Sequence, residues 1–97
     1  MNRVYIYKGE SNMSKLSDME NIGPTLEQRL INAGITTPME LRKLGSKSAY
    51  VILKEHDIDA CINTLYALEG AIQGIRWHDL ADDIKADLKR FADSEKK

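Results

Sequence analysis

The stretch Asn21-Ile22-Gly23-Pro24 decides the fold, because it must reverse the chain between two amphipathic segments. Glycine frees the backbone and proline disfavours a helical residue before it, so a preceding helix must end here. Proline also suits the first position of a new helix. Leu16 and Met19 lie on one face before the turn. We therefore predict a short helix from Met13 to the turn and a second helix from Pro24 to Ala33.

Capping residues mark the next helix ends. Gly34 fits the left-handed position after a helix, and Ile35 is then placed to pack back on the helix end. Thr37-Pro38-Met39-Glu40 has threonine as N-cap, proline at the first position and glutamate at the third. This pattern predicts a capping box at the start of a third helix. Gly45 ends that helix, and Ser46 can cap a fourth.

The remaining sequence predicts two helices with long apolar faces. Asp57 or Asp59 caps a fifth helix, which we expect to be the central one. Gly70, Ala71 and Gly74 on it permit the close approach of another helix, although Gly74 is better explained as the end of the helix. The last helix begins its apolar stripe at Trp77. The two stripes consist of Ile58, Ile62, Leu65, Leu68 and Ile72, and of Trp77, Leu80, Ile84, Leu88 and Phe91.

The first twelve residues differ from the rest of the chain. Their β-branched and aromatic pattern is typical of a strand and occurs nowhere else. The residues concerned are Val4, Tyr5, Ile6 and Tyr7. One strand cannot satisfy its own hydrogen bonds, so this arm pairs with a second copy, lies on the helices or is disordered. We predict an arm at 1–12, a helical domain at 13–93 and a polar tail at 94–97.

Composition excludes several classes of protein. The 97 residues carry 14 basic and 15 acidic side chains, and the pI is near 6.1, so no global positive charge favours nucleic acid or an anionic membrane. No apolar run approaches the ~20 residues that span a bilayer, and no signal-peptide core is evident. We expect a cytoplasmic protein without membrane contact. The single Cys61 lies beside Ala60, Ile62 and Leu65, which predicts a buried structural role.

No residue pattern predicts catalysis. Cys61, His56 and His78 lack the spacing of a local metal site. An aspartate between two helices is what an N-cap requires, so Asp57 and Asp59 indicate capping rather than acid–base chemistry. Phosphate-binding, dinucleotide-binding and nucleophile-elbow motifs are missing from the sequence. We expect no enzyme activity, no catalytic residue, no metal and no cofactor.

The reversal at 21–24 offers a candidate nucleic-acid site. A helix N-terminus exposes backbone N–H groups with partial positive charge, which can hold a phosphate of any sequence. The candidate contacts are the backbone groups of Asn21, Gly23 and Thr25, with help from Lys15 and Arg29. Pro24 has no N–H to donate, and Glu27 in the first turn would repel a phosphate. A hairpin that only builds the core is the alternative.

Arg76, Trp77 and His78 offer a second candidate surface, in which Arg76 and Trp77 are the candidate partner-binding residues. A tryptophan beside an arginine can anchor a partner protein or stack on bases. Trp77 also begins the last apolar stripe, so packing in the core is the favoured interpretation. A charge-balanced surface favours a protein as the partner.

The order of small, turn and apolar positions over residues 14 to 90 resembles the C-terminal domain of the TfoX/Sxy regulators of bacterial competence. The matching motifs are Leu16-x-x-Met19-x-Asn21-Ile22-Gly23-Pro24, Leu30-x-x-Ala33-Gly34-Ile35-x-Thr37-x-x-Glu40-Leu41, Leu44-Gly45 with Ala49-Tyr50, and Leu65-x-x-Leu68-x-Gly70-Ala71-x-x-Gly74-x-x-Trp77-x-x-Leu80. The resemblance implies a SAM-like helical domain in proteins that promote expression of DNA-uptake genes. In the family this domain commonly follows an α/β domain, for which 97 residues leave no room. We therefore expect a partial regulator, an antagonist or an adaptor.

These observations together predict an all-α, compact bundle of five or six short helices with a helix-hairpin-helix-like element and an N-terminal extended arm. The first hypothesis is binding to a protein partner in transcription or competence control. The second is direct, sequence-independent DNA binding through the hairpin. Pairing of Val4 to Tyr7 between two copies, which gives a homodimer, is a separate hypothesis.

Overall fold

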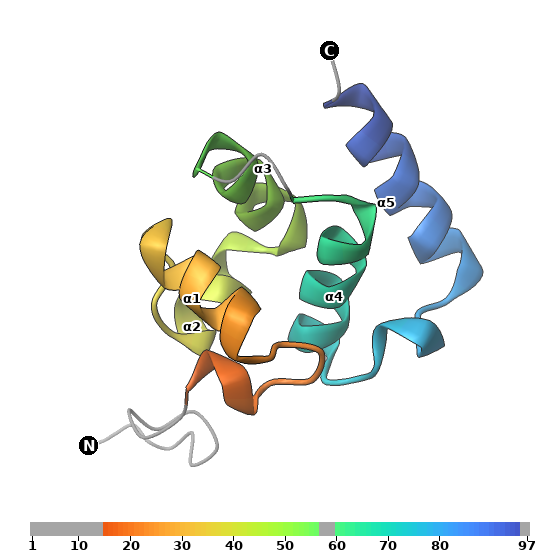
Figure 1. The fold of residues 1–97 in the computed structure, drawn as a ribbon. Helices are drawn as coiled ribbons and strands as arrows, with labels where there is room; N and C mark the ends of the chain where they lie inside the picture. Colours follow the sequence, from red (N-terminus) through yellow and green to blue (C-terminus); the bar gives the residue numbers. More distant parts are fainter. Residues whose placement is uncertain (1–14, 57–59, 96–97) are drawn as a thin grey trace.

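A computed structural model shows an all-α fold and describes residues 15–56 and 60–95 (Figure 1). The elements in chain order are η2 (Leu16–Asp18), α1 (Pro24–Asn32), α2 (Pro38–Leu44), α3 (Ser46–His56), α4 (Ile62–Gln73), η3 (Trp77–Asp79) and α5 (Asp82–Ser94). No strand occurs within the described ranges, so the predicted fold class is confirmed. The strand pattern of Val4 to Tyr7 lies outside the described residues.

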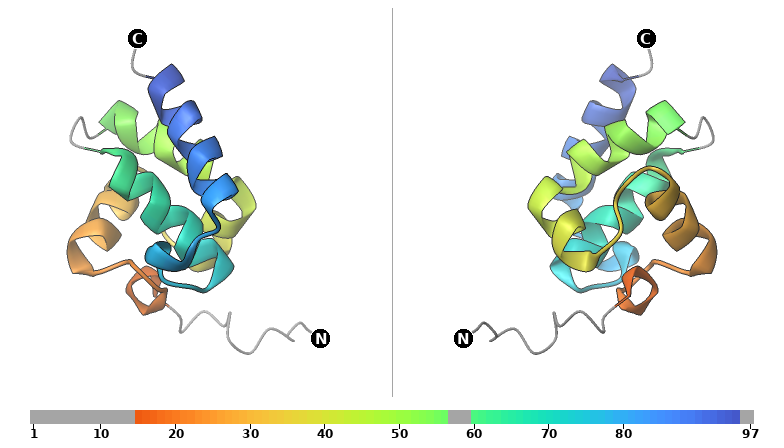
Figure 2. Two further views of the ribbon diagram at one scale, coloured as in Figure 1. Left: turned by 90° about the vertical axis from the view of Figure 1, so that its right-hand side faces the viewer. Right: turned by 90° about the vertical axis from the view of Figure 1, so that its left-hand side faces the viewer.

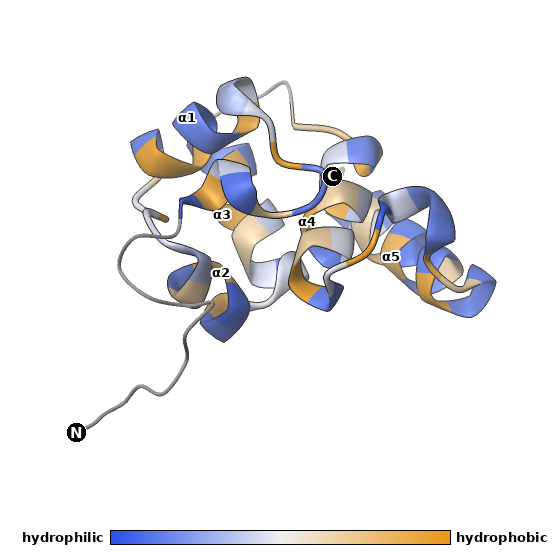
Figure 3. Cartoon of the chain, turned by 90° about the horizontal axis from the view of Figure 1, so that it is seen from below, coloured by the Kyte–Doolittle hydropathy of each residue, from blue (hydrophilic) through white to orange (hydrophobic). Residues whose placement is uncertain are grey.

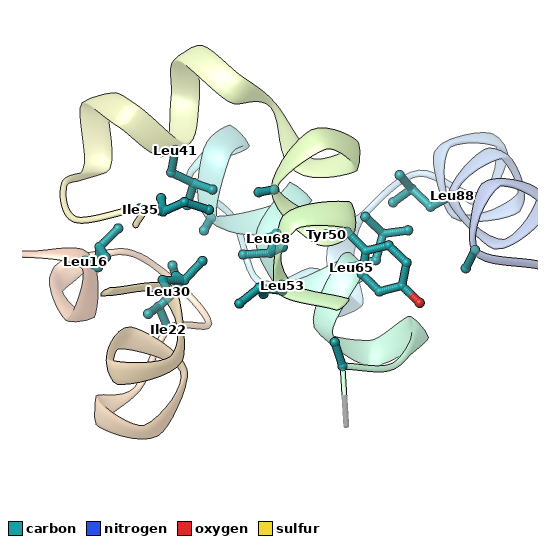
Figure 4. Packing of buried hydrophobic residues seen from close by; sticks show 14 of the residues in the cluster. Leu16, Ile22, Leu30, Ile35, Leu41, Tyr50, Leu53, Leu65, Leu68 and Leu88 are labelled. Atoms are coloured by element: carbon teal, nitrogen blue, oxygen red, sulfur yellow. The ribbon is translucent and has the colours of Figure 1, made fainter. Parts of the chain in front are cut away.

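The hydrophobic core is built around α4, as predicted. This helix packs against α3, α5 and η3, and Figures 1 and 2 show it between the α1–α3 side of the bundle and α5. The largest fully buried side chains are Leu16, Leu30, Ile35, Leu41, Leu53, Leu65 and Leu68 (Figure 4). Figure 3 shows the helices with polar and apolar sides, most clearly α5. Burying a leucine contributes about 1.5 to 3 kcal/mol, so this cluster supplies much of the stability.

Two of the predicted helix ends have the expected geometry. Gly34 has a φ of 93°, and the N–H of Ile35 donates to the carbonyl of Leu30 at 2.8 Å. The hydroxyl of Thr37 accepts from the N–H of Glu40 at 3.1 Å. The Glu40 carboxylate, however, accepts from the N–H of Thr36 at 2.7 Å, one residue before the expected partner. This bond lowers the pKa of Glu40.

The last α-helix begins five residues later than predicted. Trp77 opens the short η3 turn, and Leu80 and Ala81 then have extended backbones with ψ of 142° and 148°. Trp77 and Leu80 are three residues apart, a spacing that a 3-10 turn satisfies as well as an α-helix. Both still reach the core, because Leu80 is buried and Trp77 packs against the cluster. The apolar pattern was therefore right about burial and wrong about the helix start.

The predicted caps of α3 and α4 are wrong. Ser46 is the first residue of α3, and its buried hydroxyl donates to the Glu69 carboxylate at 2.6 Å. The N-cap of α4 is Cys61, whose N–H donates to the Thr64 hydroxyl at 3.4 Å. Neither Asp57 nor Asp59, which lie outside the described residues, holds that position. Cys61 is exposed rather than buried, because an N-cap lies outside the apolar face of its helix.

Candidate functional site around Asn21 and Trp77

The chain reversal is made by Asn21 rather than by Gly23, which lies two positions later. Asn21 has a φ of 70°, and within the described residues no other side-chain-bearing residue has a positive φ. Asparagine tolerates this left-handed conformation better than most residues. Gly23, the N-cap of α1, has a φ of −93°, which any residue adopts. The turn therefore depends on Asn21.

The side chain of Asn21 ties the turn to a distant part of the chain. Its Nδ2 donates to the carbonyl of Ile75 at 2.9 Å and to that of Ala67 at 3.3 Å. Its Oδ1 accepts from the N–H of Trp77 at 3.0 Å. One half-buried amide thus satisfies three backbone groups where α4 ends and η3 begins. We call this arrangement the Asn21 clamp.

Gly70 makes room for the Asn21 clamp. A Cβ atom at this position would lie 2.5 Å from the Nδ2 of Asn21 and 2.8 Å from the carbonyl oxygen of Ile75. The chain does come close at Gly70, but the predicted approach of another helix is wrong. The approaching group is the amide and the returning chain, which Gly74 turns back with a φ of 77°.

The Asn21 clamp holds an aromatic group at the surface. The ring of Trp77 stacks on Tyr66, with centroids 5.7 Å apart and planes 14° apart, and on His78 at 4.0 Å. The Nζ of Lys85 lies 5.8 Å from the Trp77 centroid and donates to the carbonyl of His78 at 3.2 Å. Trp77 is half-buried against the core, which confirms core packing, whereas Arg76 and His78 are exposed. We call Arg76, Trp77 and His78 the Trp77 corner.

Three of the predicted nucleic-acid contacts, Asn21, Gly23 and Thr25, lie at the start of α1, whereas Arg29 lies in the last turn of that helix. Lys15, Gly23 and Thr25 are exposed. No side chain caps α1, and among the described residues no group accepts a hydrogen bond from the N–H of Thr25 or of Leu26. These are the donors that a phosphate would need. The carboxylate of Glu27, expected to repel a phosphate, accepts from the N–H of Ser17 at 3.2 Å.

The thiol of Cys61 lies in a positive electrostatic environment at the start of α4. Backbone N–H groups at the start of α4, above all that of Thr64, lower the pKa of the Cys61 thiol, and the charge of Arg29 acts in the same direction. The Arg29 charge therefore acts at the start of α4. Within residues 15–56 and 60–95, no three histidine, cysteine, aspartate or glutamate side chains gather closely enough to hold a metal ion. No helix in that part of the chain is long and apolar enough to cross a membrane.

The structure joins two sites that the sequence presents separately. Asn21, predicted to contact nucleic acid, bonds to Trp77, predicted to contact a partner. Sequence reasoning missed Tyr66 and Lys85 as parts of this surface. Gly70 inside an apolar helix was the visible sign of a close contact, although its partner lies 49 positions earlier in the chain.

Comparison with known proteins places the chain in a family. The family model of the TfoX C-terminal domain matches residues 12–92 of this chain. An uncharacterized protein from Listeria monocytogenes, crystallised in a triclinic form, is 52% identical with a TM-score of 0.83, over 84% of this chain and 93% of that chain. A protein of unknown function from the same species, in a tetragonal form, is 53% identical with a TM-score of 0.81, over 84% of this chain and 99% of that chain. No curated protein matches. The chain therefore belongs to the TfoX C-terminal domain family.

Proposed function

We propose that the chain is a non-enzymatic regulatory or adaptor domain of competence-type gene control in the cytoplasm, and that it binds a protein partner at the Trp77 corner. The observation that carries this proposal is the Asn21 clamp, which bonds the carbonyl of Ile75 and the N–H of Trp77 and so holds the backbone on both sides of Arg76. A surface held this firmly loses little conformational freedom on binding.

The chemistry of the Trp77 corner suits a protein partner better than a nucleic acid. Tryptophan and arginine are the residues that most often dominate the binding energy of protein interfaces. Asp79 closes η3, and Asp82 and Asp83 begin α5, so exposed carboxylates follow the corner directly. Their charge opposes a phosphate backbone but is compatible with a mixed protein surface.

A charge reversal at Arg76 tests the proposal in cells. In cells that encode the chain, Arg76→Glu should abolish most of the change that the wild-type chain causes in a reporter of DNA-uptake gene expression. The matched control is Arg90→Glu, because Arg90 is exposed on α5 and lies outside the Trp77 corner. Equal effects of both variants, at equal protein levels, would count against the corner as the working surface.

The second candidate function is direct DNA binding at the start of α1. The specific observation in its favour is the uncapped N-terminus of α1, where no described residue accepts a hydrogen bond from the N–H groups of Thr25 and Leu26. Fluorescence anisotropy of a labelled duplex at low and near-physiological salt tests it. If the site binds DNA, the affinity of the chain for the duplex should fall with salt, and Thr25→Glu should weaken it. Ala86→Glu, at an exposed position of α5, should leave that affinity unchanged. Lack of binding by the wild type at low salt would remove this candidate.

A further inference from the structure

The outer side of α2 carries apolar and charged side chains that the functional proposals above do not use. Figure 3 shows this helix at the edge of the molecule, and it packs mainly against α3. The large apolar side chains exposed among the described residues are Ile31 at 39%, Met39 at 51% and Leu44 at 38%. Two of these three lie on one helix of seven residues, so the exposed apolar groups are concentrated rather than scattered.

A groove lies beside the same helix. It has a volume of about 340 Å³ and is lined by Gly34, Glu40, Lys43 and Leu44. Met39 is exposed on α2 but is not one of the lining residues. A methionine side chain is long and flexible enough to fill an irregular space of this kind. The surface of α2 therefore has both an exposed apolar side chain and a groove that such a side chain could enter.

The two charged residues of the groove, Glu40 and Lys43, have opposite signs. Oε1 of Glu40 accepts from the N–H and the hydroxyl of Thr36, at 2.7 and 2.8 Å. Its Oε2 and the Nζ of Lys43 make no hydrogen bond or ion pair with any described residue. One carboxylate oxygen and one ammonium group are therefore available to a partner that presents the opposite charge at each place.

The spacing of these residues makes the surface of α2 complementary to itself. In a two-fold contact, residue i of one copy contacts residue j of the other, and j contacts i. Between antiparallel helices, pairs of positions with the same sum face each other, as 40 with 43 and 39 with 44 do. An axis that brings Glu40 of each copy to Lys43 of the other therefore also brings Met39 to Leu44, which lines the groove. A parallel arrangement would instead oppose like charges.

We propose that the chain forms a homodimer in which the α2 helices of two copies pack antiparallel. Met39 of each copy enters the groove of the other, and two Glu40–Lys43 pairs lie beside it. One side of a seven-residue helix is smaller than the about 800 Å² per partner of a standard interface, so the dimer is weak and its formation depends on concentration. This contact does not involve the Trp77 corner.

Analytical ultracentrifugation of the full chain, from about 10 μM to about 1 mM, tests this contact. The wild type should pass from monomer to dimer over this range. Lys43→Glu should raise the dissociation constant by about tenfold or more, because the two-fold axis turns one substitution into two like-charge contacts. Lys89→Glu makes the same change of charge on exposed α5 and should leave the dissociation constant unchanged.

A mixture of two charge variants tests the antiparallel geometry. Glu40→Lys and Lys43→Glu should each be mainly monomeric alone, and an equimolar mixture should form a heterodimer, because positions 40 and 43 then carry opposite charges across the contact. Circular dichroism checks that both variants are folded, since Glu40 also bonds to Thr36. If Glu40→Lys does not fold, Met39→Glu mixed with Leu44→Lys replaces the pair and should give the same pattern. A wild type that stays monomeric at the highest concentration, a dimer that Lys43→Glu leaves intact, or a mixture that does not associate would each overturn the proposal.

Discussion

Replacing Gly70 by alanine should destabilise the domain, although the same change in an open helix interior stabilises by about 0.5 to 1 kcal/mol. The added Cβ would lie 2.8 Å from the carbonyl oxygen of Ile75, a backbone atom, and 2.5 Å from the Nδ2 of Asn21. Overpacking of this kind costs about 1 to 3 kcal/mol, and a broken hydrogen bond to a partly buried group costs about 1 kcal/mol more. After the helix preference is subtracted, the free energy of unfolding falls by about 2 kcal/mol.

Urea unfolding of Gly70→Ala, followed by circular dichroism and by the fluorescence of Trp77, measures this change. Trp77 is the single tryptophan of the chain, and the Asn21 clamp bonds its backbone N–H, so its emission reports on the unfolding of this region. A loss of about 2 kcal/mol lowers Tm by about 8 to 16 °C in a domain of this size.

The control for this experiment is Asn21→Gly, which keeps the left-handed backbone and removes the amide. In that background Gly70→Ala should cost less than in the wild type, because one of its two close contacts has gone. A Gly70→Ala variant as stable as the wild type or more stable would refute the argument that the clamp needs a glycine here.

Three other experiments have definite expected outcomes. The Thr64 backbone N–H lowers the pKa of the Cys61 thiol. The rate of alkylation of Cys61 should therefore reach half its maximum at a pH below that typical of a free cysteine. A midpoint at or above that pH would contradict the lowered pKa. Thr37→Ala removes the N-cap of α2 and should lower the free energy of urea unfolding by about 1 kcal/mol; an unchanged urea midpoint would show that the cap contributes nothing. The hydrogen bond and the charge of Lys47 hold the pKa of Asp87 in the folded protein below its value in the unfolded chain. The pair therefore stabilises the fold at pH values above the pKa of Asp87 in the unfolded chain. This stabilisation is lost as the pH falls through the pKa of Asp87 in the folded protein. Lys47→Met should therefore be less stable than the wild type at pH 7 and equally stable well below the pKa of Asp87, and an equal difference at both pH values would exclude the pair as the cause.

The sequence predicts the bundle well because its main constraints are local. Gly34 and Gly45 end helices through their own backbone conformations, and Thr37 caps the residue three positions later. Apolar spacing also identifies Leu65 and Leu68 as core residues. Each of these features depends on a few neighbouring positions, which a single sequence displays.

The sequence locates helix starts less well, because one spacing fits more than one structure. Trp77 and Leu80 satisfy both a 3-10 turn and an α-helix, and the extended backbone of Ala81 decides between them. Cys61 has small and apolar neighbours, yet it becomes an N-cap and faces water. Local composition predicts burial of the segment, but the helix start determines which of its residues face the solvent.

The candidate site could not be predicted as one unit, because its bonds join distant positions. Asn21 contacts Ala67, Ile75 and Trp77 across separations of 46, 54 and 56 residues. In the sequence, the turn at 21–24 is a sufficient reason for an asparagine at position 21, and it gives no sign of a distant hydrogen-bond partner. The amide acquires its role only when α4 places the Ile75 and Trp77 backbone groups beside the turn.

Site-specific photo-crosslinking at position 76, in cells that encode the chain, tests the central claim most directly. A photoreactive amino acid in place of Arg76 should give a discrete protein adduct that resists nuclease treatment, whereas the same group in place of Arg90 on α5 should give none. The adduct should weaken when Asn21→Gly loosens the Trp77 corner. A nuclease-sensitive adduct, or equal crosslinking from both positions, would contradict a protein interface at the Trp77 corner.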